Sequence, residues 1–161
     1  MRFHHMCIVT SDLEKSIHLW RDVLGFNLDF VGEMPDGDAP GPDVYAYPAL
    51  MDEIHGVAGS RARVAGLSSA EGAMIELMQP VNPGVEVTPP DQLRYRTTGI
   101  HELGLAVDDI DALFEKVRAA GYETQTEYVW PAANIGRTFI FYDDEGNMIQ
   151  IWQNASESSW T

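Results

Sequence analysis

Alternating apolar and polar residues predict short strands at 5–9 and 102–107. Each of these strands leads into a stretch whose apolar residues recur every three or four positions, the period of an amphipathic helix. The apolar stripes are Leu13, Ile17, Trp20 and Leu24 in the first helix, and Ile110, Leu113, Phe114 and Val117 in the second. The same strand-then-helix pattern therefore occurs twice along the chain.

The ends of both helices carry recognisable signals. Ser11 and Glu14 have the spacing of a capping box at the first helix, and Asp108 is the expected cap of the second. Gly25 and Gly121 follow the last apolar positions, where a left-handed residue commonly ends a helix. We therefore expect two amphipathic helices, each followed by another strand.

The two halves of the chain also finish alike. Residues 73–78 and 147–152 are predicted strands, and each follows a strand candidate and a turn, at 63–67 and at 137–142. The repeat predicts an α+β protein of two tandem βαβββ modules. We expect the first module at 1–82, a linker at 83–98, and the second module with a C-terminal tail at 99–161.

The halves differ in their middle. The first contains an inserted loop at 34–59, rich in Pro, Gly and Asp, with a short helix expected near 50–54. A long insertion of this kind is often a lid or a substrate-binding loop, and it is equally compatible with a partner surface.

Acidic residues outnumber basic ones by 25 to 10 among 161 residues, giving a net charge of −15. Such a surface repels phosphate backbones, so we expect no nucleic-acid partner, and it favours cations or simply keeps the protein in solution. Cys7 is the single cysteine, which excludes an intrachain disulfide. With no long apolar run and no signal-peptide pattern, we expect a cytoplasmic protein that does not insert into membranes.

These segments together resemble the vicinal oxygen chelate superfamily, which includes glyoxalase I, epimerases, extradiol dioxygenases and drug-resistance proteins. The resemblance rests on Leu-Gly-Phe at 24–26, Ile-Glu-Leu at 75–77 and Asp-Glu-Gly-Asn-Met-Ile-Gln-Ile at 144–151. It implies that the eight strands form an incomplete β-barrel. It also implies metal ligands on the first and last strand of each module, which here are His5, Glu76, Glu102 and Gln150.

Strand alternation agrees with these four positions. Ile75 and Leu77 share one face of their strand, so Glu76 points the other way, into the expected barrel. The same alternation turns Gln150 away from its apolar neighbours, Glu102 away from Leu103, and His5 away from Met6.

Two carboxylates enclosed together repel each other unless a cation neutralises them. One imidazole and three oxygen donors suit a single divalent transition metal, namely Ni, Co, Zn, Mn or Fe. The alternative is that Glu76 and Glu102 lie at a wet barrel mouth and bind nothing. The family often has histidine where Glu102 stands and glutamate where Gln150 stands; a one-residue bulge would exchange Glu102 for His101.

Other residues are candidates for substrate binding, each with a structural alternative. Cys7 is either a soft ligand or an inert core residue, and Arg137 binds an anion or forms a solvated salt bridge. The aromatic candidates Trp130, Tyr142 and Trp152 line a pocket or belong to the core.

The leading functional hypothesis is a metal-dependent lyase, isomerase or epimerase that performs α-proton chemistry on a small carbonyl substrate. Glu76 or Glu102 would be the catalytic base. The first alternative is a non-catalytic, drug-sequestering protein of the bleomycin-resistance type. A ring-cleaving dioxygenase ranks third, because it needs two histidines and one carboxylate. We expect a homodimer that binds a small molecule.

Overall fold

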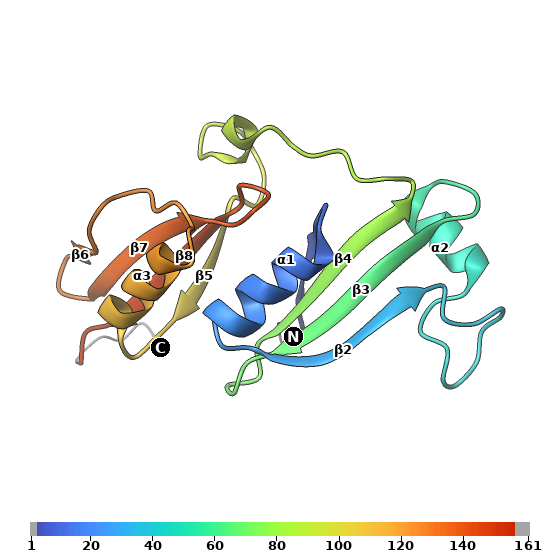
Figure 1. Cartoon of the computed structure of the whole chain (residues 1–161), viewed down its shortest axis with the longest axis horizontal. Coiled ribbons are helices and arrows are strands. Elements are labelled where there is room, and N and C mark those ends of the chain that lie inside the picture. The colour runs from blue at the N-terminus through green and yellow to red at the C-terminus, as the bar shows by residue number, and fades with distance from the viewer. Residues whose placement is uncertain (1–2, 157–161) are drawn as a thin grey trace. The chain divides into compact units, whose positions relative to one another are not determined.

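The computed structural model describes residues 3–156, which form two compact units that meet in sequence between Val87 and Thr88. The described residues form two four-stranded sheets, each built from one βαβββ module (Figure 1). The predicted α+β class with two tandem modules is confirmed. Residues 157–161 of the predicted C-terminal tail lie outside the described residues.

Unit 1 contains one sheet in the order β1-β4-β3-β2, in which β1 runs parallel to β4 and the other neighbours are antiparallel. Its elements are β1 (Met6–Val9), α1 (Leu13–Ile17), the π-helical segment η1 (His18–Val23), β2 (Asn27–Met34), α2 (Pro48–His55), β3 (Arg61–Ser68) and β4 (Met74–Asn82).

Unit 2 repeats this topology, with the order β5-β8-β7-β6 and a parallel β5–β8 pair. A short 3-10 helix, η2 (Pro90–Leu93), precedes the sheet within the predicted linker. The remaining elements are β5 (Glu102–Ala106), α3 (Ile110–Ala119), β6 (Trp130–Ala132), β7 (Gly136–Tyr142) and β8 (Met148–Asn154).

In each unit the helix covers one face of the sheet because its apolar stripe is buried there. Leu13, Ile17 and Trp20 are at most 3% exposed, and α1 packs on β3 and β4, where Ile75 and Leu77 are also buried. Burying a side chain of this size contributes about 1.5–3 kcal/mol. These contacts fix which face of each strand remains for chemistry.

The core of unit 2 is more aromatic. Ile110, Phe114 and Val117 of α3 are buried, and the Phe114 ring meets Phe139 of β7 edge-to-face at 5.1 Å between centroids. Phe141 is fully buried on the same side of β7. The stripe predicted for this helix is therefore confirmed, with Leu113 half-buried at its edge.

The predicted caps of both helices are wrong by one residue. Asp12, not Ser11, caps α1 by accepting a hydrogen bond from the Lys15 backbone N–H at 3.2 Å. Asp109, not Asp108, caps α3 in the same way. The capping aspartate has extended backbone angles, so its carboxylate can accept a hydrogen bond from the backbone N–H of the third helical residue. Each helix therefore begins directly at its first apolar residue.

The first helix widens in its second half. The backbone N–H of Leu24 donates to the carbonyl of Leu19, five residues earlier, at 2.9 Å. The wider π turn changes the helical period, so Val23 is buried at 4% exposure while Leu24, predicted for the stripe, is only half-buried. Gly25 follows with φ of 82°, the expected left-handed exit.

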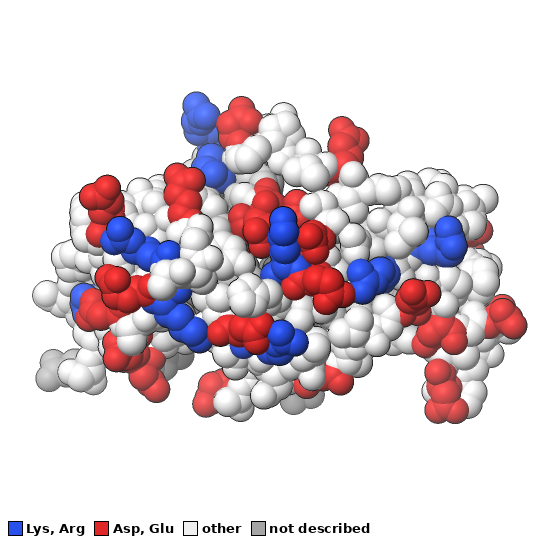
Figure 2. All heavy atoms as spheres, in the orientation of Figure 1, with Lys and Arg blue, Asp and Glu red and all other residues white. Residues whose placement is uncertain are grey.

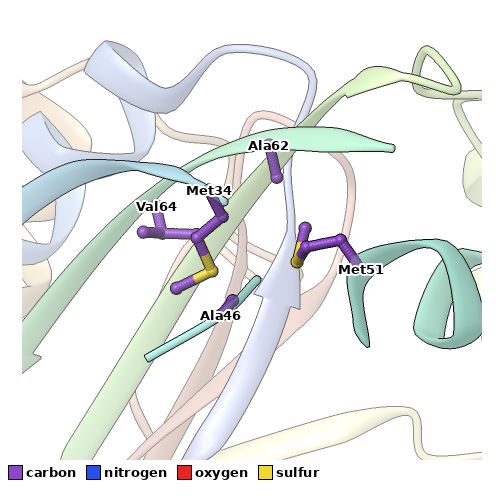
Figure 3. Close-up of a cluster of buried hydrophobic side chains, with 5 residues drawn as sticks. All are labelled: Met34, Ala46, Met51, Ala62 and Val64. Carbon is purple, nitrogen blue, oxygen red and sulfur yellow. The ribbon is translucent and has the colours of Figure 1, made fainter. Parts of the chain in front are cut away.

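We call the sheet face opposite α1 or α3 the open face of its unit. In unit 1 the inserted segment folds onto part of this face. Figure 3 shows its cluster of buried side chains converging from β2, β3, α2 and the loop before α2; they are Met34, Ala46, Met51, Ala62 and Val64. The predicted short helix is confirmed as α2 (Pro48–His55). The insertion is therefore a packed element with its own hydrophobic cluster.

The helix-bearing faces carry intermingled charges, and Figure 2 shows Lys and Arg side chains beside Asp and Glu. Arg63 pairs with Glu14 at 2.7 Å, and Arg21 pairs with its neighbour Asp22. Exposed pairs of this kind contribute little to stability. None of the helices within residues 3–156 is long and apolar enough to span a membrane.

Candidate functional site

In unit 1 the parallel β1–β4 register sets Cys7 directly opposite Glu76. The Cys7 thiol is hydrogen bonded to the Glu76 carboxylate, and partial desolvation of the thiol together with that negative charge raises the pKa of Cys7 to about 12. Cys7 is therefore a protonated thiol at neutral pH, a poor metal ligand that helps to hold Glu76.

His5 lies two residues before Cys7, and strand alternation gives it the same side. Its neighbour in sequence, Met6, is half-buried toward the helix, whereas His5 and Cys7 are exposed on the open face. The Nδ1 atoms of His4 and His5 are 2.7 Å apart. Nε2 is therefore the nitrogen that His5 can offer to an ion.

Glu76 is flanked by two aromatic side chains, neither of which the sequence analysis selected. Tyr45 of the insertion donates its hydroxyl to Oε2 of Glu76 at 3.3 Å. Gly66 is the β3 partner of Glu76, and a Cβ on Gly66 would lie 2.2 Å from Cε1 of Phe30. The Phe30 ring therefore lies against the sheet backbone beside Glu76. The sequence signal for this contact was Gly66 itself, because a glycine inside a strand often marks a place where another group comes close to the backbone.

In unit 2 the equivalent strand pair is β5–β8. Gly104 is the register partner of Gln150, and a Cβ on Gly104 would lie 3.9 Å from Oε1 of that amide. Gly104 therefore occupies the position that Cys7 has in unit 1. Two residues earlier, Glu102 occupies the position of His5. The two pairs of predicted donors thus have the same places in the two modules.

The β5–β8 register runs from Glu102 to Ala106 without the bulge that would exchange Glu102 for His101. The Nε2 of His101 is 2.5 Å from the carbonyl oxygen of Thr97. Its Nδ1 is buried and has no hydrogen-bond partner within residues 3–156. The alternation of the strand accordingly gives Glu102, and not His101, the face of Gln150.

Glu102 also accepts a hydrogen bond from a tyrosine hydroxyl, that of Tyr95. Burial and the Glu102 carboxylate raise the pKa of Tyr95 to about 12, so the phenol stays protonated. The neighbouring Arg94 lies 4.0 Å above the Tyr142 ring and donates to the Gly146 carbonyl at 2.9 Å. Arg94 and Tyr95 belong to the predicted linker, where no periodic pattern in the sequence indicated them as site residues.

The three aromatic candidates of unit 2 share the open face with Gln150. Trp130 and Trp152 both pair with Thr138, and Tyr142 pairs with Met148, two residues before Gln150. Trp152 packs against Gly136, where a Cβ would lie 2.8 Å from its ring. The structure therefore brings Trp130, Tyr142 and Trp152 to one face, as a binding role requires.

Arg137 lies on the opposite face. Its guanidinium donates to both carboxylate oxygens of Asp111 on α3, each at 2.6 Å. Alternation along β7 explains this placement, because Arg137 shares its side with Phe139 and Phe141 under the helix. Arg137 therefore lies on the face opposite Gln150, and the predicted alternative of a solvated salt bridge is the interaction that the structure shows.

A cavity of about 340 Å³ lies near the β6–β7 turn. It is bordered by Ala133, Asn134, Gly136, Arg137, Gln153, Asn154 and Ala155. This lining contains no histidine or carboxylate, so the cavity is not where the predicted donors act.

Within the described residues, no three His, Cys, Asp or Glu side chains group closely enough to hold a metal ion. Each unit instead carries two of the four predicted donors. Unit 1 carries an imidazole and a carboxylate, and unit 2 carries a carboxylate and an amide; each of these is a donor type that first-row divalent ions accept.

The family model of the Glyoxalase/Bleomycin resistance protein/Dioxygenase superfamily matches residues 2–151. The chain belongs to this superfamily. Comparison with curated proteins gives no match. The superfamily includes metalloenzymes and non-catalytic binding proteins, so membership defines the scaffold and leaves the chemistry to the site.

Solved structures of the superfamily share the fold of this chain. A glyoxalase family protein from Bacillus cereus has a TM-score of 0.79 at 19% identity, covering 97% of this chain and 95% of that one. TnmS3, an antibiotic binding protein from a Streptomyces species, has a TM-score of 0.54 at 20% identity, with 96% and 97% covered.

A third similar structure is a variant of the fosfomycin resistance protein FosX from Listeria monocytogenes. It has a TM-score of 0.60 at 12% identity and covers 97% of this chain and 92% of that one. That protein was solved with Mn(II) and 1S,2S-dihydroxypropylphosphonic acid. At these identities the likenesses show the fold alone.

Proposed function

We propose that this protein is a metal-dependent lyase, isomerase or epimerase that moves a proton next to a carbonyl group of a small substrate. The observation that carries the proposal is the equivalent placement of His5 with Glu76 and of Glu102 with Gln150 on the open faces of the two modules. These four side chains are the proposed donors to one divalent transition metal.

The two glutamates are the proposed bases. Glu76 and Glu102 are half-buried carboxylates on otherwise apolar strands, and each is held by a hydroxyl that donates to it. A carboxylate can accept the proton from the carbon beside the carbonyl and return it to that carbon or to the adjacent one. The thiol of Cys7 restricts where the Glu76 carboxylate can point.

A divalent ion bound by this set would supply Lewis-acid stabilisation of the negative charge that develops on the carbonyl oxygen. The protein residues do the rest: Phe30 and Tyr45 flank Glu76, and the indole and phenol rings near Gln150 can contact the substrate body. One imidazole in the donor set argues against ring-cleaving dioxygenase chemistry, which uses two histidines and one carboxylate.

A second candidate function is sequestration of a cationic ligand without chemistry. The net charge of −15 favours it, because an acidic groove attracts a basic drug-like molecule. We further propose that the protein acts on small molecules as a homodimer, as the family resemblance implies, and that it does so in the cytoplasm.

The test is the metal content of untagged purified protein, measured by inductively coupled plasma mass spectrometry. We expect about one transition metal per chain in the wild type and none in Glu76→Ala. Glu14→Ala is the control, because Glu14 lies on the helix-bearing face paired with Arg63. A wild-type protein free of metal, and indifferent to added Ni, Co, Mn, Fe or Zn, would leave ligand sequestration as the better account.

A further inference from the structure

The open face of unit 1 carries a single row of side chains in which a carboxylate lies beside an aromatic ring. Cys7, Glu76, Gly66 and Phe30 are successive register partners across β1, β4, β3 and β2. Partners across a sheet share a face, so the four residues lie side by side. The Phe30 ring lies over Gly66 and is 49% exposed. Glu76 therefore has a thiol on one side and an exposed ring on the other.

Tyr45 brings a second exposed ring to Glu76 from the insertion. Its hydroxyl donates to Oε2 of Glu76 at 3.3 Å, and its side chain is 65% exposed. The backbone is held by Asp36, whose carboxylate accepts hydrogen bonds from the N–H groups of Tyr45 at 3.1 Å and Ala46 at 2.8 Å. Ala46 is buried in the cluster of Figure 3. The Tyr45 ring is thus held beside the carboxylate without being buried itself.

The charge of Glu76 is not balanced within the described part of the chain. No Lys, Arg or His of residues 3–156 forms an ion pair with it, and its two hydrogen-bond donors, a phenol and a thiol, are neutral. The described Lys and Arg residues of unit 1 belong to α1, η1 or the helix-facing side of β3; they are Lys15, Arg21, Arg61 and Arg63. The negative charge therefore remains for a ligand.

The surroundings of Glu76 on this face are apolar. Met74 and Met78 lie two residues before and after it on β4 and share its side. Met74 is 40% exposed, and Val9, the partner of Met78, is 50% exposed. Hydrocarbon around a carboxylate screens its charge less than water does, so a cation that reaches Glu76 is attracted more strongly than in bulk solvent. The exposed apolar groups favour a ligand that also has a hydrocarbon body.

We propose that the open face of unit 1 binds an organic cation, with Glu76 facing its ammonium group and the rings of Phe30 and Tyr45 facing the carbon atoms around that charge. The faces of aromatic rings are negative and attract such cations. A metal ion needs several donor atoms, and the described residues contain no group of three His, Cys, Asp or Glu that could hold one. An ammonium ligand needs one opposite charge and exposed ring faces, which unit 1 supplies by itself.

This site rests on the second candidate function, sequestration of a cationic ligand, and gives it a location and a ligand class. The class is an amine joined to an apolar body. Binding there requires neither a transition metal nor a residue of unit 2. The inserted segment acquires a role as well, because it supplies the anchored Tyr45 that the second module has no equivalent insertion to provide.

The probe is benzyltrimethylammonium, compared with neutral benzyl alcohol and with benzoate. Each is titrated into the metal-stripped full chain and followed through the amide signals in NMR spectra. We expect the cation to shift signals around Glu76, Phe30 and Tyr45. Benzyl alcohol should bind about tenfold more weakly and benzoate not measurably, because the attraction to the carboxylate is lost or reversed. Glu76→Gln should weaken binding of the cation by about tenfold and leave that of benzyl alcohol unchanged.

Variants of the two rings test the aromatic part of the site. Phe30→Leu and Tyr45→Leu should each weaken binding of the cation by about 2- to 5-fold, the contribution of an exposed ring to a bound cation. Tyr45→Phe keeps the ring and should bind as wild type does. The matched controls are Glu14→Gln, which removes a charge from the helix-bearing face, and Tyr128→Leu, which removes a ring that is 61% exposed in unit 2. Both should bind as wild type does, and the same spectra show whether each variant is folded.

Three outcomes would overturn the inference. They are equal binding of the cation and benzyl alcohol, wild-type affinity in Glu76→Gln, and an equal loss in Glu14→Gln, which would reflect overall charge. The proposed chemistry fails separately. Protein that binds the cation but takes up no transition metal supports the ammonium site and contradicts the metal-dependent reaction. Protein that takes up the metal but binds no cation supports the reaction and contradicts the ammonium site.

Discussion

The two units share a topology and a strand register, yet they surround their donors differently. In unit 1 the partner of Glu76 on β3 is Gly66, and the Phe30 ring fills the space above this glycine. In unit 2 the partner of Gln150 on β7 is Ile140, whose own side chain is 3% exposed. The segment from the end of the helix to the donor on the last strand also differs in length. It spans 50 residues in the first module, from Phe26 to Glu76, and 28 in the second, from Tyr122 to Gln150.

The comparison separates what the repeat determines from what is added to it. Alternation and register place the four proposed donors at equivalent positions, independent of the insertion. The added segments supply the aromatic and hydroxyl groups around the donors. A change in the shared part should therefore affect both units alike, whereas a change in an added segment should affect only its own.

The largest effect is expected from the glutamates. Glu76→Gln and Glu102→Gln should each lower turnover by about 10²- to 10⁴-fold, because the amide cannot accept the transferred proton. Exchange of α-protons for deuterium, followed by NMR across a panel of small hydroxycarbonyl and thioester compounds, measures this. If one variant keeps normal kcat, the two modules do not contribute equally.

The next effect concerns Cys7, whose counterpart in unit 2 is a glycine. In metal-free protein its raised pKa, about 12 against an ordinary 9.0, implies about a thousandfold less thiolate near pH 8. Alkylation should therefore be slow and rise about tenfold per pH unit up to that pKa. Glu76→Gln leaves the desolvation of the thiol, which is the larger cause, but removes the negative charge that raises the pKa further, and it should accelerate alkylation. Rates of iodoacetamide labelling that match a free thiol in wild type would contradict this.

A smaller effect is expected in the insertion cluster. Met51→Ala should lower the free energy of unfolding by about 2–5 kcal/mol, because it leaves a cavity in the cluster that Met51 shares with Met34 and Val64. Met74→Ala is the matched control, since Met74 is 40% exposed, and it should cost far less. Urea unfolding followed by tryptophan fluorescence measures both. Equal losses would mean that the insertion is not packed against the sheet.

The smallest effect tests the shared part. Asp12→Ala and Asp109→Ala each remove a helix cap and should cost about 0.5–2 kcal/mol by similar amounts. Ser11→Ala and Asp108→Ala should cost less, because the N-cap residue of each helix is the aspartate that follows them. Thermal unfolding of the four variants decides the point. A larger loss for Ser11→Ala than for Asp12→Ala would reverse the assignment of the first cap.

The donors could be predicted from sequence because their neighbours are strongly patterned. Ile75 and Leu77 are buried at 4% and 0% exposure, so the side of Glu76 followed from alternation alone. The face on which Arg137 lies could be predicted in the same way, because Arg137 is two residues from Phe139 and therefore shares its side of the strand.

Tyr45 and Tyr95 could not be predicted in the same way. Both lie in segments without periodic patterning, where position depends on contacts distant in sequence, such as Asp36 with Ala46 and Arg94 with Tyr142. The caps were missed for a more local reason. Ser11 and Asp108 are good capping residues, but Asp12 and Asp109 directly precede the first buried residue of each helix.

The most direct test of the account is the stoichiometry of Mn(II) or Co(II) binding to metal-stripped protein, measured by calorimetry for wild type, Glu76→Ala and Glu102→Ala. The account predicts one ion per chain in wild type, and loss of that ion in both variants, because each module contributes donors to the same ion. Two ions per chain, or wild-type binding by either variant, would contradict it.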